Sequence, residues 1–263
     1  RRELRTIPGE KFSRADLIRS QREIVNLGYF DQEKLGMQPV PNQDDGTVDI
    51  NYSVVEKSSD QLELSAGWGG GIGLTGTLGI TFNNFSIKDI FKKDAYKPIP
   101  MGDGQKLALR LQASRFYQTY SFSFSEPWLG GKRPVQFSTS LSHTKQFLYN
   151  YQTGNADKSK SFNITGITFG LAKRLTVPDD FFVLSQAVSF QRYDLNNYNT
   201  GLFTFGNGFA NNLSYTVGLS RNNTNVDPIY PTGGSKFGVT AKLSIPYSLF
   251  DGTDYTQLKV KEI

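Results

Sequence analysis

From residue 58 onward, apolar and polar side chains alternate along the chain with a period of two. In YSFSFS (120–125), Tyr120, Phe122 and Phe124 share one side of an extended chain and three serines share the other. The pattern recurs in GLTGTLGITF (73–82), QKLALRLQA (105–113), NLSYTVGLS (212–220) and SKFGVTAKLSIPY (235–247). It predicts strands with one apolar and one polar face. Less regular alternation predicts further strands at 62–68, 135–147, 161–173, 181–193 and 254–263, which makes ten.

Such strands suit either a soluble sandwich, whose apolar faces meet, or a membrane barrel, whose apolar faces meet lipid. We favour a mainly β fold, an antiparallel transmembrane β-barrel, because the strands are about 9 to 13 residues long, near the length that crosses a bilayer at a tilt. Their polar faces carry mostly Ser, Thr, Gly, Gln and Lys, as in a lumen. Aromatic residues near the predicted strand ends would form an interfacial girdle: Tyr117, Tyr120, Trp128, Tyr149, Tyr151, Tyr193, Tyr230 and Tyr247.

Residues 1–57 have a different pattern, which predicts a small α+β unit. A helix is expected from about residue 14 to 27, because Ser13 can cap its start and Gly28 can end it. Asp16 would complete a variant of the capping box, and Leu17, Ile24 and Leu27 would form the apolar face. Two strands, at 35–40 and 47–57, should follow, joined by a turn at 42–46. From these residues alone, an ordinary structural domain is the simplest interpretation.

Composition narrows the function classes. The chain has no apolar run near the roughly 18 residues that a membrane-spanning helix needs, so any membrane crossing uses strands. It has no cysteine, which excludes disulfides and thiolate metal or redox sites. The net charge of +5 is too diffuse for a nucleic-acid surface. The N-terminal RRELRTIPGE lacks the apolar core of a signal peptide.

The residues that could suggest catalysis or ligand binding have simpler structural explanations. His143 has Ser140 and Ser142 beside it, but sequence neighbours do not imply the geometry of a Ser–His pair. Gly69, Gly70 and Gly71 lack the Lys-Ser/Thr and the helix of a phosphate loop. Asp44, Asp45 and Asp49 lack calcium-loop spacing. We therefore expect no catalytic residue, no metal and no cofactor.

Two turns rich in proline and glycine are expected at one rim of the barrel. If residues 1–57 are periplasmic, the connections at 83–104, 126–134, 174–180 and 221–235 lie on the periplasmic side. The outer loops are then 69–72, 114–119, 148–160, 194–211 and 248–253. In the periplasmic connections we interpret Pro127 as a strand end, Trp128 as an interfacial anchor, and the glycines as turn formers. These rim residues are Glu126, Pro127, Trp128, Gly130, Gly131, Asp227, Pro228, Gly233 and Gly234.

Several separated motifs, in order along the whole chain, resemble one family. They are LGYFDQEKLGMQPVPNQDDGTVDINYSVVEK (27–57), LELSAGWGG (62–70), TFNNFS (81–86), SFSEPWLGGKRP (123–134) and DPIYPTGGSKF (227–237). The chain resembles the BamA family of outer-membrane β-barrel assembly factors, most closely the Bacteroidota-type members. The resemblance implies a membrane-proximal POTRA domain at 1–57, incomplete at its N-terminus, and the N-terminal part of a barrel at 58–263. The family barrel has sixteen strands and an Arg-Gly-Phe/Tyr motif that does not occur here, so we expect a fragment of a longer protein.

The resemblance also implies a function without bond chemistry. The protein would fold and insert β-barrel proteins into the outer membrane, with its POTRA domain in the periplasm. Its partners would be unfolded outer-membrane proteins, lipoprotein subunits and outer-membrane lipid. The pairing edge for an incoming strand would be the first barrel strand, which is rich in glycine and weakly apolar: Leu62, Glu63, Leu64, Ser65, Ala66 and Gly67. The alternative is a POTRA-barrel translocation or secretion pore.

Overall fold

The computed structural model describes residues 3–57, 59–69, 73–96, 99–131, 134–199, 201, 203, 206–224 and 233–245. The chain forms two compact units, Arg1–Asp60 and Gln61–Ile263. The sequence-based boundary lay at residue 57. The two units are described one after the other.

The helix of the first unit begins and ends where local sequence signals predict. Helix α1 spans Arg14–Leu27, and the Ser13 hydroxyl accepts a hydrogen bond from the Asp16 amide at 3.3 Å. Gly28 adopts a left-handed conformation (φ 74°) and its amide donates to the Val25 carbonyl. Both cap predictions are confirmed. Within the described residues, no helix has both the length and the apolar character needed to cross a membrane.

The small core of this unit includes one polar residue that the apolar pattern did not reveal. Leu17 and Ile24 are buried on α1, as predicted, but Ser20 lies between them and is fully buried. Its hydroxyl accepts hydrogen bonds from the Arg5 and Thr6 amides, at 2.8 and 3.3 Å. Ser20 therefore fastens the segment before the helix to the helix itself.

A two-stranded antiparallel sheet completes the first unit. Strand β1 (Gly36–Asn42) pairs with β2 (Thr47–Ser53) from Gly36 opposite Ser53 to Asn42 opposite Thr47. A 3₁₀ turn, η1 (Gln32–Lys34), precedes β1. The second strand is shorter than the predicted 47–57, because after Ser53 only an isolated bridge between Phe30 and Glu56 continues the pairing.

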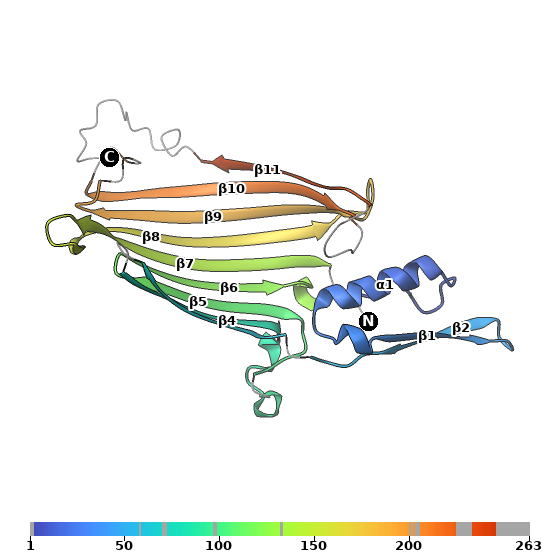
Figure 1. The fold of residues 1–263 in the computed structure, drawn as a ribbon. Helices are drawn as coiled ribbons and strands as arrows, with labels where there is room; N and C mark the ends of the chain where they lie inside the picture. Colours follow the sequence, from blue (N-terminus) through green and yellow to red (C-terminus); the bar gives the residue numbers. More distant parts are fainter. Residues whose placement is uncertain are drawn as a thin grey trace. The chain divides into compact units, whose positions relative to one another are not determined.

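The second unit is a single antiparallel sheet in which sequence neighbours are also spatial neighbours, from β3 to β11. Figure 1 shows these strands side by side. The strands are β3 (Gln61–Gly69), β4 (Gly73–Phe85), β5 (Gln105–Ser114), β6 (Tyr117–Glu126), β7 (Val135–Asn150), β8 (Asn155–Arg174), β9 (Phe182–Asn196), β10 (Gly208–Asn222) and β11 (Lys236–Ser244). Three short 3₁₀ turns lie in the described connections. Two are between β4 and β5, η2 (Ile87–Asp89) and η3 (Lys93–Ala95), and one is between β6 and β7, η4 (Leu129–Gly131). The predicted strand at 254–263 lies outside the described residues.

The two faces of this sheet differ in chemistry on every strand from β3 to β10. One row of directly opposed residues is entirely apolar: Leu62, Ile80, Leu109, Phe122, Leu141, Ile167, Phe190 and Leu213. The adjacent row is polar or glycine: Glu63, Gly79, Arg110, Ser121, Ser142, Gly166, Gln191 and Asn212. We call the face with the first row the outer face and the face with the second row the inner face.

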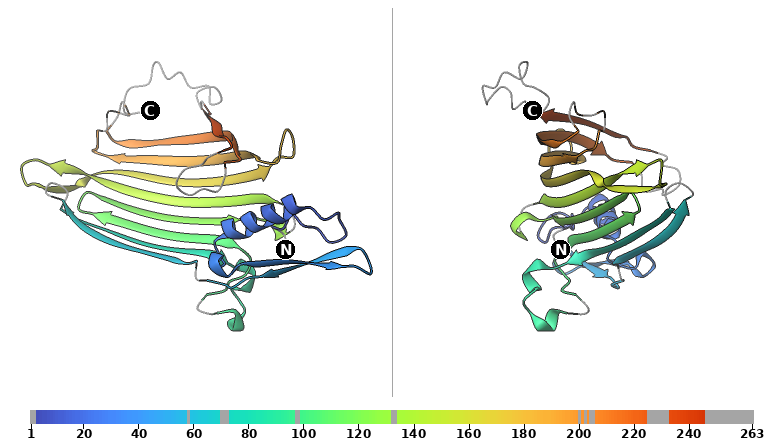
Figure 2. Two further views of the ribbon diagram at one scale, coloured as in Figure 1. Left: turned by 45° about the vertical axis from the view of Figure 1, so that its right-hand side comes forward. Right: turned by 90° about the vertical axis from the view of Figure 1, so that its left-hand side faces the viewer.

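Many large apolar side chains of the outer face are exposed, whereas several small residues of the inner face are buried. On β10, Ser214 and Gly218 are buried, while Leu219 on the outer face is exposed. The described residues of this unit form one sheet only, so no second sheet covers its outer face. In the end-on view of Figure 2 the strands follow an arc, as in part of a barrel wall. The arrangement contradicts a sandwich core and agrees with an outer face that meets lipid.

Several strands continue beyond their predicted ends, so the outer loops are shorter than predicted. The expected loop at 148–160 is wrong in extent, since β7 and β8 pair until Asn150 opposes Asn155. The apolar alternation stops near Ser161, but backbone pairing continues through polar residues after a register shift at Phe147. The connection expected at 194–211 is likewise shortened to 197–207 by β9 and β10.

Two tyrosines that we predicted in the lipid-facing girdle lie on the inner face, one of them in an aromatic cluster. Phe162 and Leu195 are buried opposite one another there, and the Tyr193 and Tyr198 rings stack on Phe162 at 6.1 and 5.9 Å. Tyr193 therefore does not belong to a lipid-facing girdle. Nor does Tyr117, whose hydroxyl oxygen lies 3.1 Å from Nε2 of the inner-face residue Gln112. The prediction used position along the strand and ignored which face each residue occupies; Tyr230 and Tyr247 lie outside the described residues.

Replacing Ser13 with Ala should destabilise α1 by about 1 kcal/mol, because the first-turn amides lose their side-chain acceptor. In the intact protein, hydrogen exchange should accelerate in the first turn of the helix and stay unchanged in β1 and β2. Ser13→Asp, which keeps an acceptor, is the matched control and should retain protection. Equal exchange in Ser13→Ala and the unsubstituted protein would contradict this account of the helix start.

Candidate functional site: the first strand and the rim turns

Strand β3 is an edge strand with a complete set of partners on one side. All nine of its residues pair with β4, from Gln61 opposite Thr81 to Gly69 opposite Gly73. Among the described residues, no strand pairs with its other side. The residues expected to form a pairing edge, Leu62 to Gly67, all lie within β3. An edge strand presents free backbone amides and carbonyls to any chain that approaches in an extended conformation.

The strand β3 also has an exposed apolar outer face. Leu62, Leu64 and Trp68 lie on the outer face, and Leu64 is 78% exposed. Trp68 gives β3 a stronger apolar face than we inferred from residues 62–67. The strand therefore combines an unpaired edge with a lipid-compatible outer surface.

One ion pair on the inner face ties β3 to β5 across the strand between them. Arg110 Nη2 donates to Glu63 Oε1 at 3.0 Å, and Gly79 on β4 lies between these two residues in the cross-strand row. A Cβ at Gly79 would come within 3.2 Å of the Glu63 side chain, so glycine provides the space for this pair. Both partners are about half exposed, and ion pairs of this kind contribute little, about 0–1 kcal/mol.

The turns at the end where β4 leaves the sheet are held by a partly buried polar network, which we call the rim network. Antiparallel order places the start of β3 and the ends of β4 and β6 at this same end, the rim end. The network consists of Asn84, Ser86, Asp89, Asp103, Gln105 and Glu126.

Gln105 is the centre of the rim network. It is 1% exposed; its Oε1 accepts from the Ile87 amide at 2.7 Å and its Nε2 donates to Glu126 Oε2 at 2.6 Å. A buried amide group with both ends hydrogen-bonded fixes the positions of its partners, because leaving either partner unsatisfied costs about 1–3 kcal/mol. Gln105 therefore joins the turn after β4 to the end of β6.

Ser86 and four charged residues hold the turn after β4. The Ser86 hydroxyl is fully buried and lies 3.0 Å from Asp89 Oδ2 and 2.8 Å from Asp103 Oδ2. It has one proton and donates to one carboxylate at a time. Lys92 and Lys88 balance the two carboxylates, at 2.7 and 3.6 Å. The hydrogen bond from Lys92, followed by that from Ser86, lowers the pKa of Asp89.

The SEPWLGG segment forms the turn after β6. The strand ends at Glu126, immediately before Pro127, and Glu126 Oε1 accepts from the Trp128 amide at 2.9 Å. Gly130 and Gly131 lie in the short η4 turn, with Gly130 at φ 66°. Each Glu126 oxygen thus has a separate partner, Gln105 or the Trp128 amide, which gives this carboxylate a structural role.

A second rim cluster surrounds Arg221 at the end of β10, and the sequence did not indicate it. Its Nε and Nη2 donate to Asp179 Oδ2 at 2.9 and 2.8 Å, and its Nη1 donates to the Ser235 hydroxyl. Its guanidinium also packs over the Phe181 and Phe182 rings. Arg221 therefore links the β8–β9 turn to the β10–β11 turn.

The glycine-rich motif beside this cluster is only partly described. Asn223 and Ser235 close the base of the β10–β11 turn through two hydrogen bonds, Asn223 N to Ser235 O at 3.1 Å and Ser235 N to Asn223 Oδ1 at 2.7 Å. Gly234 has φ 93°, and a Cβ there would overlap the Asn223 carbonyl oxygen. Gly233 is adjacent, whereas Asp227 and Pro228 lie outside the described residues.

His143 lies on the outer face, not beside a nucleophile. It lines an apolar groove of about 620 Å³ with Leu111, Tyr120 and other outer-face residues. Its Nδ1 lies 2.8 Å from Thr165 Oγ1. Ser142 belongs to the inner-face row, and strand alternation places Ser140 on that face too, so neither neighbouring serine is positioned for a Ser–His pair. The described residues also contain no cluster of three or more His, Cys, Asp or Glu side chains suited to a metal ion.

An open sheet with a lipid-facing outer face and a small α+β unit before it define a class: transmembrane β-barrel proteins with a preceding accessory domain. The family model of the Omp85 superfamily domain matches residues 101–261, and the POTRA model, described as a surface antigen variable number repeat, matches residues 1–57. The chain therefore belongs to the Omp85 superfamily. It is of the BamA type and is an outer-membrane protein.

Individual relatives agree with this assignment. The outer membrane protein assembly factor BamA of Neisseria meningitidis serogroup B is 30% identical over 266 aligned positions, covering 94% of this chain and 30% of the relative. A putative outer membrane protein assembly factor of Treponema pallidum is 27% identical over 150 positions, covering 56% of this chain and 16% of the relative. The chain thus spans less than a third of either relative. The Bacteroidota-type resemblance remains a sequence-based prediction.

A solved structure supports the same fold. The crystal structure of BamA from Haemophilus ducreyi lacking POTRA domains 1–3 superposes with a TM-score of 0.55 at 18% identity. The match covers 93% of this chain and 45% of that chain.

The Asp179–Arg221 contact should make the second rim cluster sensitive to acid. The hydrogen bond from Arg221 lowers the pKa of Asp179, so its stabilisation is present above the unfolded-state pKa of about 3.9 and is lost as the pH falls through the folded-state value. Thermal unfolding of the full-length protein should therefore show Asp179→Asn as less stable near pH 7, and the difference should shrink as the pH falls below the unfolded-state pKa of Asp179. Asp94→Asn, in another rim turn, serves as the control. A difference for Asp179→Asn that does not change with pH would contradict this assignment.

Proposed function

We propose that this chain is part of an outer-membrane protein assembly factor that folds and inserts β-barrel proteins by pairing an incoming strand with the edge of β3. The observation that carries the proposal is a first strand paired along its whole length with β4 while its other edge has no partner among the described residues. Membership in the Omp85 superfamily and the similarity to assembly factors support it.

The physical basis is the cost of unpaired backbone groups in lipid. Each unsatisfied amide or carbonyl in the hydrocarbon region costs several kcal/mol, so an isolated strand does not enter a bilayer. An edge strand already at membrane depth offers hydrogen-bond partners to the first strand of a substrate. Each added strand then presents a new edge to the next one.

The contacts that hold β3 to the sheet are compatible with an incoming strand that pairs at its free edge. The rim network begins at the end of β4 and joins β4 to β5 and β6, but it includes no residue of β3. The side-chain tie described above, Glu63 to Arg110, is partly exposed and weak. β3 therefore depends mainly on its backbone pairing with β4, while the rim network fixes the strands behind it.

The same proposal assigns the domains and the partners. Residues 1–57 are the membrane-proximal POTRA domain on the periplasmic side, and residues 58–263 are the N-terminal part of the barrel. Unfolded outer-membrane proteins, lipoprotein subunits of an assembly complex and outer-membrane lipid are its partners. Glu126, Pro127, Trp128, Gly130, Gly131, Asp227, Pro228, Gly233 and Gly234 belong to the periplasmic rim. No residue is catalytic, since assembly makes and breaks no covalent bond.

A translocation or secretion pore is the alternative, favoured by the polar inner face. The aromatic cluster of Phe162, Tyr193 and Tyr198 covers part of that face. The two functions separate in vesicles: an assembly factor accelerates folding of added barrel proteins, whereas a pore conducts or passes substrate without that acceleration.

In a closed barrel the free edge of β3 would meet another strand, and we call this junction the seam. A disulfide that crosslinks the seam should stop assembly. In the full-length protein, one cysteine replaces Glu63 or Ser65, and a second is placed on the strand that faces β3 across the seam. Crosslinking should abolish the acceleration of barrel folding in vesicles, because the incoming strand can no longer pair with β3. Reduction should restore it.

The control disulfide joins β3 to β4 and leaves the seam free. Ser65 and Thr77 are directly opposite, close enough for a crosslink. This variant should remain active when oxidised. If the seam-locked protein, with crosslinking verified as near complete, still assembled barrels at the uncrosslinked rate, strand exchange at β3 would be ruled out.

A further inference from the structure

The turn between β4 and β5 exposes large apolar side chains that the assembly mechanism does not use. Phe91, between η2 and η3, is 94% exposed, and Ile87 and Tyr96 are about half exposed. All three lie on one 19-residue connection, 86–104, between β4 and β5. A single exposed apolar residue is ordinary, but several on one short turn suggest contact with a non-aqueous phase or a partner.

The turn is held in one conformation at its base. The Ser86 amide donates to the Pro100 carbonyl at 3.0 Å, and the Gly102 amide donates to the Asn84 carbonyl at 2.9 Å. Further along, the Tyr96 hydroxyl donates to the Ile90 carbonyl at 2.8 Å and Lys92 pairs with Asp89. These contacts stand beside the rim network. Phe91 therefore lies on a turn whose described residues are joined by hydrogen bonds at its base and along its length.

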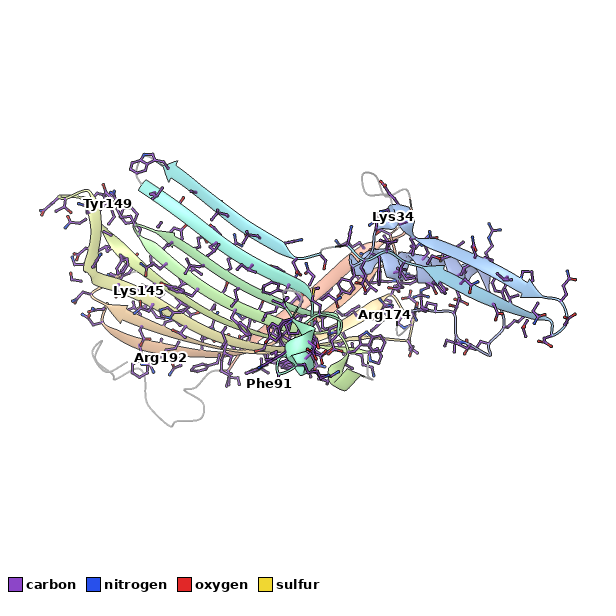
Figure 3. All side chains as sticks on the ribbon, turned by 90° about the horizontal axis from the view of Figure 1, so that it is seen from below. Lys34, Phe91, Lys145, Tyr149, Arg174 and Arg192 are labelled. Atoms are coloured by element: carbon purple, nitrogen blue, oxygen red, sulfur yellow. The ribbon has the colours of Figure 1, made fainter. Side chains whose placement is uncertain are left out.

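The position of the turn identifies what surrounds it. In the end-on view of Figure 2 the turn lies outside the arc of strands. Figure 3 shows Phe91 at one end of the strands, with Lys145, Tyr149 and Arg192 toward the other. The outer face reaches this end through apolar residues such as Phe82 and Phe124. Phe91 thus lies at the end of the strands where the outer face finishes in these apolar residues, and in a membrane-embedded barrel this end is at the depth of the interface.

Lipid is the occupant that this surface fits. Aromatic side chains favour the boundary between headgroups and acyl chains, and neighbouring lysines can extend their ammonium groups toward phosphates. Lys93 flanks Phe91 on the same turn and is exposed, whereas the ammonium groups of Lys88 and Lys92 pair with Asp103 and Asp89. We propose that the β4–β5 turn is a membrane anchor, with Phe91 inserted at the headgroup boundary of the leaflet on the rim side. The inference requires the barrel to be in a membrane but does not depend on assembly activity.

A single spin label measures the depth of Phe91. The chain has no cysteine, so Phe91→Cys gives one labelling site in these residues. Gln152→Cys is the control, because Gln152 is exposed, is polar, and lies in the turn between β7 and β8 at the opposite end. Both variants are made in the full-length protein and reconstituted in vesicles of phosphatidylethanolamine and phosphatidylglycerol.

The label at position 91 should collide with dissolved oxygen and with lipid-borne relaxing agents. Its collision rate with a water-soluble nickel complex should be at least about fivefold lower than that of the label at position 152. Equal nickel accessibility at the two positions would overturn the proposal. Protection of position 91 that appears only after accessory proteins are added would also overturn it, and would assign the surface to a protein partner. Barrel folding by the unlabelled protein is measured in the same vesicles, so a failure of the anchor is distinguishable from a failure of assembly.

Discussion

The backbone of a strand in lipid must find hydrogen-bond partners, and the rest of this structure depends on that constraint. Every strand from β4 to β10 meets it by pairing on both sides, whereas β3 meets it on one side only within the described residues. The same constraint that builds the sheet therefore makes its first edge reactive toward another extended chain. The function proposed above would use the same backbone hydrogen bonding that stabilises the sheet.

The other features keep that edge available. The outer face carries an uninterrupted apolar row from Leu62 to Leu213, which holds the sheet at membrane depth. The rim network, centred on Gln105, joins β4, β5 and β6, and the Arg221 cluster joins the later turns. The wall behind β3 is thus fixed at its rim by buried or charge-assisted contacts. Among the described residues, β3 is held by its backbone ladder, the Glu63–Arg110 pair and a hydrogen bond from Thr75 Oγ1 to the Gly67 carbonyl at 3.3 Å. In the proposed mechanism, this difference in attachment would let the first strand exchange partners without loss of the remaining sheet.

Local and periodic signals predicted much of this fold, but contacts between distant residues had no comparable signal. Ser13 and Gly28 define α1 through interactions within four residues, and alternation identified both faces of the sheet. Strand length was underestimated in β8, because backbone pairing continues where side-chain alternation stops. Tyr193 was assigned to the wrong face for the related reason that nearness to a strand end does not set orientation. The structural roles of Gln105 and Arg221 were not predicted. Their hydrogen-bond partners are 21 and 42 positions away, and a single polar residue with a distant partner produces no periodic pattern in the sequence.

The central claim is that a substrate strand pairs with β3 in a defined register. Disulfide mapping tests it most directly: single cysteines from Leu62 to Gly67 in the full-length protein are combined with single cysteines along the terminal strand of a barrel substrate stalled during assembly. Single cysteines at Leu141 and Ser142 on β7 provide the comparison. The account predicts crosslinks at β3 that shift by one substrate position for each step along the strand, and none at β7. Crosslinks equally frequent at β3 and β7, or at β3 without any register, would contradict it.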